Sequence, residues 1–239
     1  MMRLKDFGIE LYIPSTGRAG AVTTSDLFYD GDYKLVVRES EKEEYSKYDL
    51  VVFPDEDINS LSKVRQKIID TSKKKLVLQC DDDLSVIAYK NKENYLEMTK
   101  DQVVQEIVRM FTIVTDLRLG YWTVTPNADV RKYRAPITFK GIAGGIVGFN
   151  KEYLKSRYDE RLFTRTDLDM LMQETRNNRI ALIADYIMIK QKRDKNTGGN
   201  NSKKTSRKIG LADEIMKQKW GKYYEYDREK NIPKILYKR

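Results

Sequence analysis

The sequence contains no histidine and only one cysteine among its 239 residues. Without histidine, the chain cannot form a Ser-His-Asp or Cys-His catalytic group, and it offers no imidazole as a general base or metal ligand. A single cysteine excludes an internal disulfide and fits a reducing cytoplasm. Any chemistry must therefore be carried by carboxylates and a bound metal ion.

Long apolar runs are also absent. The most apolar stretch, residues 142–149, is rich in glycine and far too short to cross a bilayer. The first residues lack the apolar core of a secretory signal. A chain of 239 residues can bury one substantial core, and its aromatic content of 10% argues against disorder. We expect one domain with no membrane association.

Three consecutive carboxylates, Asp81, Asp82 and Asp83, directly follow the apolar run Leu76–Cys80. That run predicts a buried strand, and ligands of open α/β sheets bind just beyond the carboxyl ends of strands. Three like charges at such a place repel one another, and burial adds to the cost. Mg²⁺ or Mn²⁺, which prefer oxygen ligands, would remove that cost. A solvated acidic turn is the alternative.

The net charge of +9 is concentrated in one stretch of the chain. Residues 190–208 hold eight basic residues against one acid, Asp194, which amounts to +7 of the total. Such a concentration favours a polyanionic partner, through neutralised phosphates and released counterions. A solubilising loop is the alternative. The basic residues are Lys190, Lys192, Arg193, Lys195, Lys203, Lys204, Arg207 and Lys208.

Apolar runs alternate with helix-like segments along the chain, which is typical of an α/β domain. Ser60 is expected to cap a helix that runs to Ser72, and Thr99 with Gln102 forms a capping-box pattern for a second helix. The alternation predicts a central, mostly parallel sheet flanked by helices on both faces. Strands are expected at residues 10–13, 34–37, 50–53, 76–80, 121–125, 145–149, 180–184 and 186–189, and a further helix over 211–220.

A turn of five residues follows the first expected strand. Proline ends strand pairing, glycine allows a tight turn, and the hydroxyl and guanidinium groups can donate to a ribose or a phosphate. An ordinary turn is equally compatible with this pentapeptide. Arg65 and the pair Arg38-Glu39 could approach a nucleotide bound over the strand ends, or could form surface ion pairs instead. The turn consists of Pro14, Ser15, Thr16, Gly17 and Arg18.

Two further segments carry candidate site residues. Asp167 and Asp169 stand at the expected start of a helix, where they could cap the helix or act as a base beside a substrate hydroxyl. Gly144 and Gly145 permit close approach of the backbone to a ligand or to another element.

These motifs occur in a recognisable order. The Pro-Ser-Thr-Gly-Arg turn comes first, then Glu39 with Tyr45, the helix with Arg65, the aspartate triplet, and the late glycine-rich and Asp-Leu-Asp segments. In this order they resemble the GT-A class of nucleotide-sugar-dependent glycosyltransferases. More specifically, the chain is similar to the TET-associated glycosyltransferases of bacteriophages, which are linked to sugar modification of hydroxymethylated pyrimidines in DNA. The likeness covers roughly residues 9–190.

The resemblance implies a role for each motif. Asp81 would lie toward the donor ribose, and Asp81 with Asp83 would hold Mn²⁺ or Mg²⁺ against the donor diphosphate. Asp167 or Asp169 would be the acid on the acceptor side. Many GT-A enzymes take a third metal ligand, often histidine, from a late segment, so Asp185, an asparagine or water would have to replace it. The nucleotide-sugar site would include Pro14, Ser15, Thr16, Gly17, Arg18, Glu39, Arg65, Asp81, Asp82, Gly144 and Gly145.

The expected function is metal-dependent transfer of a sugar, with UDP-glucose as the favoured donor, to a hydroxymethylated or already glycosylated pyrimidine in phage DNA. The host cytoplasm would be the location of a phage-encoded enzyme. Tyr121, Trp122 and Tyr133 are candidates to stack on an acceptor base. Two alternatives stay open: a nucleotidyltransferase with a similar nucleotide and metal site, and a DNA-binding module without catalysis.

We expect a single domain with four parts. The nucleotide-sugar-binding half would span 1–125, the acceptor-side half 126–190, a basic mobile loop 191–208, and a C-terminal helix and tail 209–239.

Overall fold

The computed structural model describes residues 1–126, 128–133, 135–139, 141–191, 206–227 and 232–236. Its centre is an eight-stranded sheet in which all strands run in one direction except β9 and β8. The carboxyl ends of β1, β2 and β4 therefore meet at one edge. The strand order is β3 (Leu50–Phe53), β2 (Tyr33–Arg38), β1 (Ile9–Pro14), β4 (Leu76–Cys80), β9 (Ile146–Asn150), β7 (Tyr121–Val124), β10 (Leu182–Ala184) and β8 (Ile137–Thr138).

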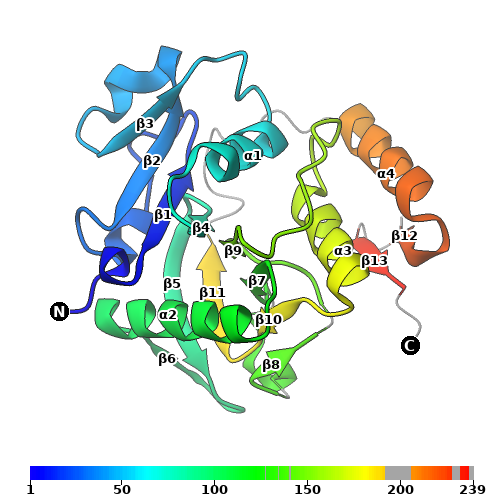
Figure 1. Ribbon diagram of the computed structural model, residues 1–239. Coiled ribbons are helices and arrows are strands. Elements are labelled where there is room, and N and C mark those ends of the chain that lie inside the picture. Colours follow the sequence, from blue (N-terminus) through cyan, green and yellow to red (C-terminus); the bar gives the residue numbers. More distant parts are fainter. Residues whose placement is uncertain (127, 134, 140, 192–205, 228–231, 237–239) are drawn as a thin grey trace.

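Helices cover both faces of this sheet, as the alternating pattern predicts (Figure 1). On one face α1 (Leu61–Thr71) and α3 (Thr166–Asn178) share a core with alternate strand residues such as Tyr12 and Val77. On the other face α2 (Lys100–Asp116) packs against the opposite set, including Leu11 and Leu78. The predicted mostly parallel α/β architecture is confirmed.

The predicted helix starts are also confirmed. The Ser60 hydroxyl accepts a hydrogen bond from the Lys63 backbone at the start of α1. At the start of α2, Thr99 and Gln102 form the reciprocal capping box that the sequence predicts. Each cap satisfies a backbone donor that the first helical turn leaves without a partner.

A second sheet lies beside the acidic triplet. β5 (Leu84–Lys90) begins directly after Asp83 and pairs with β11 (Ile187–Gln191) on one side and β6 (Tyr95–Glu97) on the other. The register of β11 shifts between Lys190 and Gln191. The sequence gives no signal for β5, because no glycine or proline separates it from the triplet to mark a new element.

The C-terminal part packs against α3. α4 (Ser206–Trp220) lies beside α3 (Figure 1), and the hairpin β12 (Tyr224–Asp227) and β13 (Ile232–Ile235) follows it. These elements share a separate small core of Leu162, Leu168, Met172, Ala212, Met216, Trp220 and Tyr224. Of the helices in the described residues, none combines the length and apolar character needed to cross a membrane.

Candidate active site

A cleft of about 310 Å³ opens at the carboxyl ends of β1, β2 and β4. The start of α1 forms one further wall, and the segment leading into α3 forms another. Open α/β sheets bind their ligands at this edge. The lining includes Pro14, Ser15, Thr16, Arg18, Arg38, Ser60, Arg65, Asp81, Asp82, Asp83, Thr164, Arg165, Asp167 and Gln191.

The central aspartate of the triplet organises the wall of the cleft. Asp82 is 6% exposed and accepts hydrogen bonds from the Ser15 hydroxyl at 2.6 Å and from Arg18 Nη1 at 2.7 Å. Burial raises the pKa of Asp82, although the bonds from Ser15 and Arg18 oppose that shift. Asp82 therefore fixes the Pro14–Arg18 turn to the end of β4.

The short helical segment Glu39–Tyr45 holds the same turn from the other side. Glu41 accepts from the Thr16 hydroxyl at 2.6 Å and from the Gly17 backbone at 3.1 Å, and the Tyr45 hydroxyl accepts from the Arg18 backbone at 2.8 Å. Gly17 has a φ of 62°, in the left-handed region that glycine adopts without strain. Glu39 is exposed and does not line the cleft, so Glu41 is the carboxylate that contacts the turn.

The two outer aspartates share one amide group. Gln191, at the end of β11, directs Nε2 at Asp81 Oδ2 at 2.8 Å and at Asp83 Oδ1 at 3.5 Å. Gly145 leaves the room for this contact, since a Cβ there would lie 2.4 Å from Gln191 Nε2 and 2.9 Å from Asp81 Oδ2. The sequence gives no signal for Gln191, because it becomes a neighbour of the triplet only through the pairing of β11 with β5.

Gly144 has a different neighbour from the one expected. A Cβ on Gly144 would lie 2.8 Å from the Val124 carbonyl oxygen, and the residue does not line the cleft. The absence of a side chain at Gly144 therefore lets its backbone pack closely against β7, and Gly144 does not contact a ligand in the cleft directly.

Arg65 is buried under the cleft, with a side chain that is 3% exposed. Its Nη2 donates to Asp81 Oδ1 at 2.6 Å, and its Nη1 pairs with Asp167 Oδ1. The guanidinium also lies over the Tyr158 ring, 6.0 Å from its centroid. Burial by itself would lower the pKa of Arg65, but Tyr158 and Asp81 more than offset this and raise it. Arg65 is thus a fixed cation that joins the triplet to the first turn of α3.

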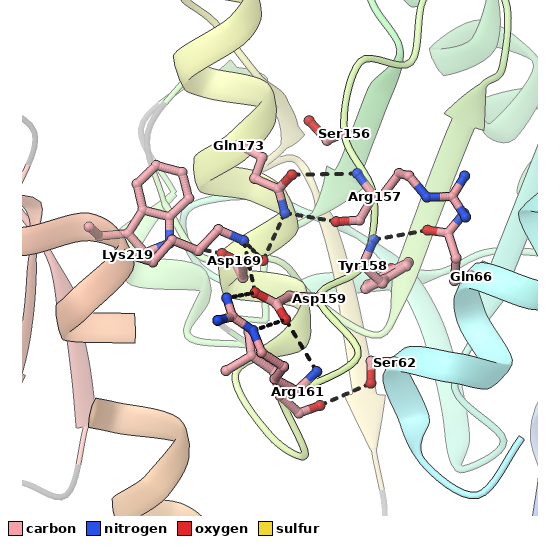
Figure 2. Close-up of polar contacts among 12 residues, drawn as sticks. Ser62, Gln66, Ser156, Arg157, Tyr158, Asp159, Arg161, Asp169, Gln173 and Lys219 are labelled. Carbon is pink, nitrogen blue, oxygen red and sulfur yellow. Dashed lines mark hydrogen bonds and ion pairs between the residues drawn. The ribbon is translucent and has the colours of Figure 1, made fainter. Parts of the chain in front are cut away.

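The structure separates the two acids at the start of α3. Asp167 lines the cleft, and its side chain is 30% exposed. Asp169 is fully buried and points away toward α4, where Trp220 Nε1, Lys219 Nζ and Gln173 Nε2 each donate to it at 2.8 Å. Figure 2 shows Asp169 with Gln173 and Lys219. The structure does not place Asp169 at the site, because the helical turn directs it to the opposite side.

Other expected site residues also lie elsewhere. Asp185 pairs with the fully buried side chain of Lys90 at 3.2 Å and does not line the cleft, so it is not placed to replace a histidine ligand. Tyr121 and Trp122 are buried in the core and are not available to stack on a base. Tyr133 is half-buried and is not part of the cleft wall.

Most of the basic stretch lies outside the described residues, including Lys192, Arg193, Lys195, Lys203 and Lys204. Three of its members are described. Lys190 donates to the Tyr95 hydroxyl at 2.5 Å, Lys208 lies over the Phe163 ring at 4.1 Å from its centroid, and Arg207 is exposed. Since Phe163 lines the cleft, Lys208 places one positive charge of this stretch near the cleft wall.

The donor set around the triplet is compatible with a hard divalent cation. Across the described residues, no three His, Cys, Asp or Glu side chains gather in a metal-binding group. Asp81 and Asp83 nevertheless converge on one amide, and rotation of that amide by half a turn would present its oxygen in place of its nitrogen. Mg²⁺ commonly binds through one or two carboxylates together with substrate phosphates and water, so Asp81, Asp83 and Gln191 fit such an ion.

Comparison with known families identifies the chain. The family model described as TET-Associated Glycosyltransferase matches residues 9–199. The chain belongs to this family of glycosyltransferases. The resemblance expected from the order of the motifs is therefore confirmed. No curated protein sequence matches the chain significantly.

Solved glycosyltransferase structures share the fold. Glucosyl-3-phosphoglycerate synthase from Mycobacterium tuberculosis superimposes with a TM-score of 0.57 at 6% identity, covering 99% of this chain and 93% of that one. The same enzyme in complex with Mg²⁺ and UDP gives a TM-score of 0.54 at 6% identity, covering 99% and 92%. A mannosyltransferase from Pyrobaculum calidifontis, in complex with GDP-Man and Mn²⁺, superimposes with a TM-score of 0.52 at 11% identity. The match covers 78% of this chain and 58% of the mannosyltransferase chain. These matches show the α/β fold of GT-A glycosyltransferases.

Proposed function

We propose that this glycosyltransferase moves a sugar from a nucleoside-diphosphate sugar to a hydroxymethylated, or already glycosylated, pyrimidine in phage DNA, with Mn²⁺ or Mg²⁺ as cofactor. The observation that carries the proposal is the position of the acidic triplet. Asp81 and Asp83 converge on the Gln191 amide at the ligand-binding edge of the sheet, inside a cleft with room for a nucleotide. The family match supplies the reaction class.

The donor would lie across the strand ends. Asp81, Asp83 and Gln191 would hold the cation, which when bound supplies the positive charge that the departing nucleoside diphosphate requires. The Pro14–Arg18 turn, fixed by Asp82, Glu41 and Tyr45, would line the nucleoside. Solved structures of enzymes with this fold contain bound UDP-Glc in one case and bound GDP-Man in another. UDP-glucose is the first donor to test.

Asp167 would serve the acceptor. Its carboxylate faces the cleft close to the triplet, to which Arg65 joins it. In transfer, the acceptor oxygen forms a bond to the anomeric carbon, the bond from that carbon to the diphosphate oxygen breaks, and Asp167 takes the hydroxyl proton. The nucleoside diphosphate leaves with the bonding electrons.

DNA as acceptor is supported by the family and by the distribution of charge. Residues 190–208 carry +7 of the net charge of +9. Of the described part of this stretch, Gln191 lines the cleft and Lys208 lies over the ring of Phe163 in the cleft wall. A polycation at that place would neutralise backbone phosphates. The target base would have to leave the duplex to reach Asp167, at a cost of roughly a few kcal/mol.

A product assay tests the proposal. Hydroxymethylcytosine-containing DNA is incubated with Mn²⁺ and a panel of nucleotide sugars. The DNA is then digested to nucleosides, and their masses are measured by mass spectrometry. We expect a nucleoside heavier by one sugar, with release of nucleoside diphosphate. Asp83→Ala should abolish the product with unchanged circular dichroism, because the cation loses a ligand. Glu152→Gln, at the exposed pair with Lys75, is the matched control and should keep full activity.

Three results would contradict this account. Full activity of the Asp83→Ala variant would show that the reaction does not require the proposed metal site. Release of pyrophosphate would indicate nucleotidyl transfer. DNA binding without metal-dependent affinity for any nucleotide would indicate a module without catalysis.

A further inference from the structure

We propose that Arg65 is a positioning residue that holds the acceptor-side Asp167 at a fixed place relative to Asp81 on the donor side. This inference rests on the proposed function and deepens it. The resemblance implies that Arg65 belongs to the nucleotide-sugar site, and the residues alone leave an ion pair open. In the structure Arg65 lines the cleft, its guanidinium is buried, and two of its nitrogens are paired with one aspartate on each side.

The geometry makes Arg65 a rigid link. Its two terminal nitrogens point at different carboxylates, Nη2 at Asp81 and Nη1 at Asp167, so that a single planar group spans both sides. The side chain is 3% exposed, and the Tyr158 ring lies against it. Gln79 Nε2 donates to the Arg65 carbonyl at 3.0 Å, which ties this turn of α1 to β4. Neither the backbone nor the side chain of Arg65 is placed to move with a ligand.

Asp167 depends on this link for its position. Asp167 is the second residue of α3. The residue that precedes the helix, Arg165, has a φ of 68°, in the left-handed region that non-glycine residues rarely adopt. Within the described residues, Arg65 is the contact that fixes the Asp167 carboxylate. A general base must lie within hydrogen-bond reach of the acceptor hydroxyl, so a small displacement would slow proton transfer while leaving the donor in place.

The test is a double-mutant cycle on the transfer reaction. We expect Arg65→Met to lower kcat by about 100-fold, with the KM for the donor changed by less than about 3-fold. Asp167→Asn should lower kcat similarly, and the double variant should be no more than about 3-fold slower than Asp167→Asn, because both changes remove the same unit. Arg65→Lys keeps the charge but not the planar fork, so it should recover part of kcat. Arg157→Met, at the exposed pair with Asp70, is the control and should behave as the wild type.

Additive losses in the cycle would overturn the proposal, as would a rise in donor KM without a fall in kcat. If Arg65→Met does not fold, Arg65→Lys with Asp167→Asn completes the same cycle. If the wild type transfers no sugar, the proposed function fails. In that case, the contact between Arg65 and Asp167 is tested by a double-mutant cycle on the free energy of unfolding in urea. A coupling energy of zero between the two residues would contradict the link.

Discussion

Three chemically identical side chains in a row acquire different roles from their surroundings. Asp82 points into the protein and bonds Ser15 and Arg18, whereas Asp81 and Asp83 lie beside the Gln191 amide. The middle carboxylate fixes the wall of the cleft. Its two neighbours converge on Gln191 while they also pair with cations, Asp81 with Arg65 at 2.6 Å and Asp83 with Arg18 at 3.5 Å.

The pH dependence of stability should report the burial of Asp82. Because burial raises its pKa in the folded state, Asp82 favours folding when protonated, and this contribution is lost as the pH rises through the raised pKa. Between about pH 6 and about pH 4, the wild type should gain unfolding free energy relative to Asp82→Asn as the pH falls. Urea denaturation at the two pH values measures the difference. A difference that is constant, or that shrinks as the pH falls, would contradict the assignment.

Among the elements, α4 depends on a single buried carboxylate. Asp169 of α3 receives hydrogen bonds from both Lys219 and Trp220 at the end of α4, and it has no contact with solvent. The two helices also bury the apolar side chains of their shared core, which holds the C-terminal part against the wall of the cleft.

Loss of that carboxylate should loosen α4. Asp169→Ala leaves the Lys219 charge and the Trp220 indole nitrogen without their partner, so the unfolding free energy should fall by about 3 kcal/mol. Urea denaturation followed by circular dichroism gives this value, and Trp220 fluorescence reports the environment of α4. Glu214→Gln, an exposed acid on the same helix, is the control and should change stability by less than about 0.5 kcal/mol. A cost equal to that of the control would show that Asp169 does not hold α4.

The sequence predicts regular elements well and pairings across the chain poorly. The strand runs, the Ser60 cap and the Thr99–Gln102 capping box are local patterns, and the structure confirms them. The sequence pattern gives no signal for β5, which begins directly after Asp83, nor for the β12–β13 hairpin, whose strands Tyr-Glu-Tyr-Asp and Ile-Pro-Lys-Ile contain no apolar run. The sequence pattern makes Asp167 and Asp169 equal candidates, because both stand at the expected start of a helix; only the docking of α4 shows where Asp169 points.

For the whole molecule, the excess positive charge is concentrated in one stretch of the sequence. The carboxylates Asp81, Asp82, Asp83 and Asp167 line the cleft together with four arginines, while residues 190–208 carry +7 of the net charge of +9. The resemblance places the triplet and the Pro14–Arg18 turn in one nucleotide-sugar site, and the parallel pairing of β1 with β4 brings them together. Local sequence was not sufficient for Gln191 and for the partners of Arg65, which come together only when the second sheet and α3 have packed.

The most direct test of the account is a titration of the intact protein with Mn²⁺, followed by electron paramagnetic resonance of the free ion, in the presence of UDP. The account predicts saturable binding of about one ion per chain by the wild type and by Asp82→Asn, with binding weakened at least about 10-fold in Asp83→Asn and Asp81→Asn. Equal binding by the wild type and Asp83→Asn would place the metal elsewhere and would contradict the proposed site.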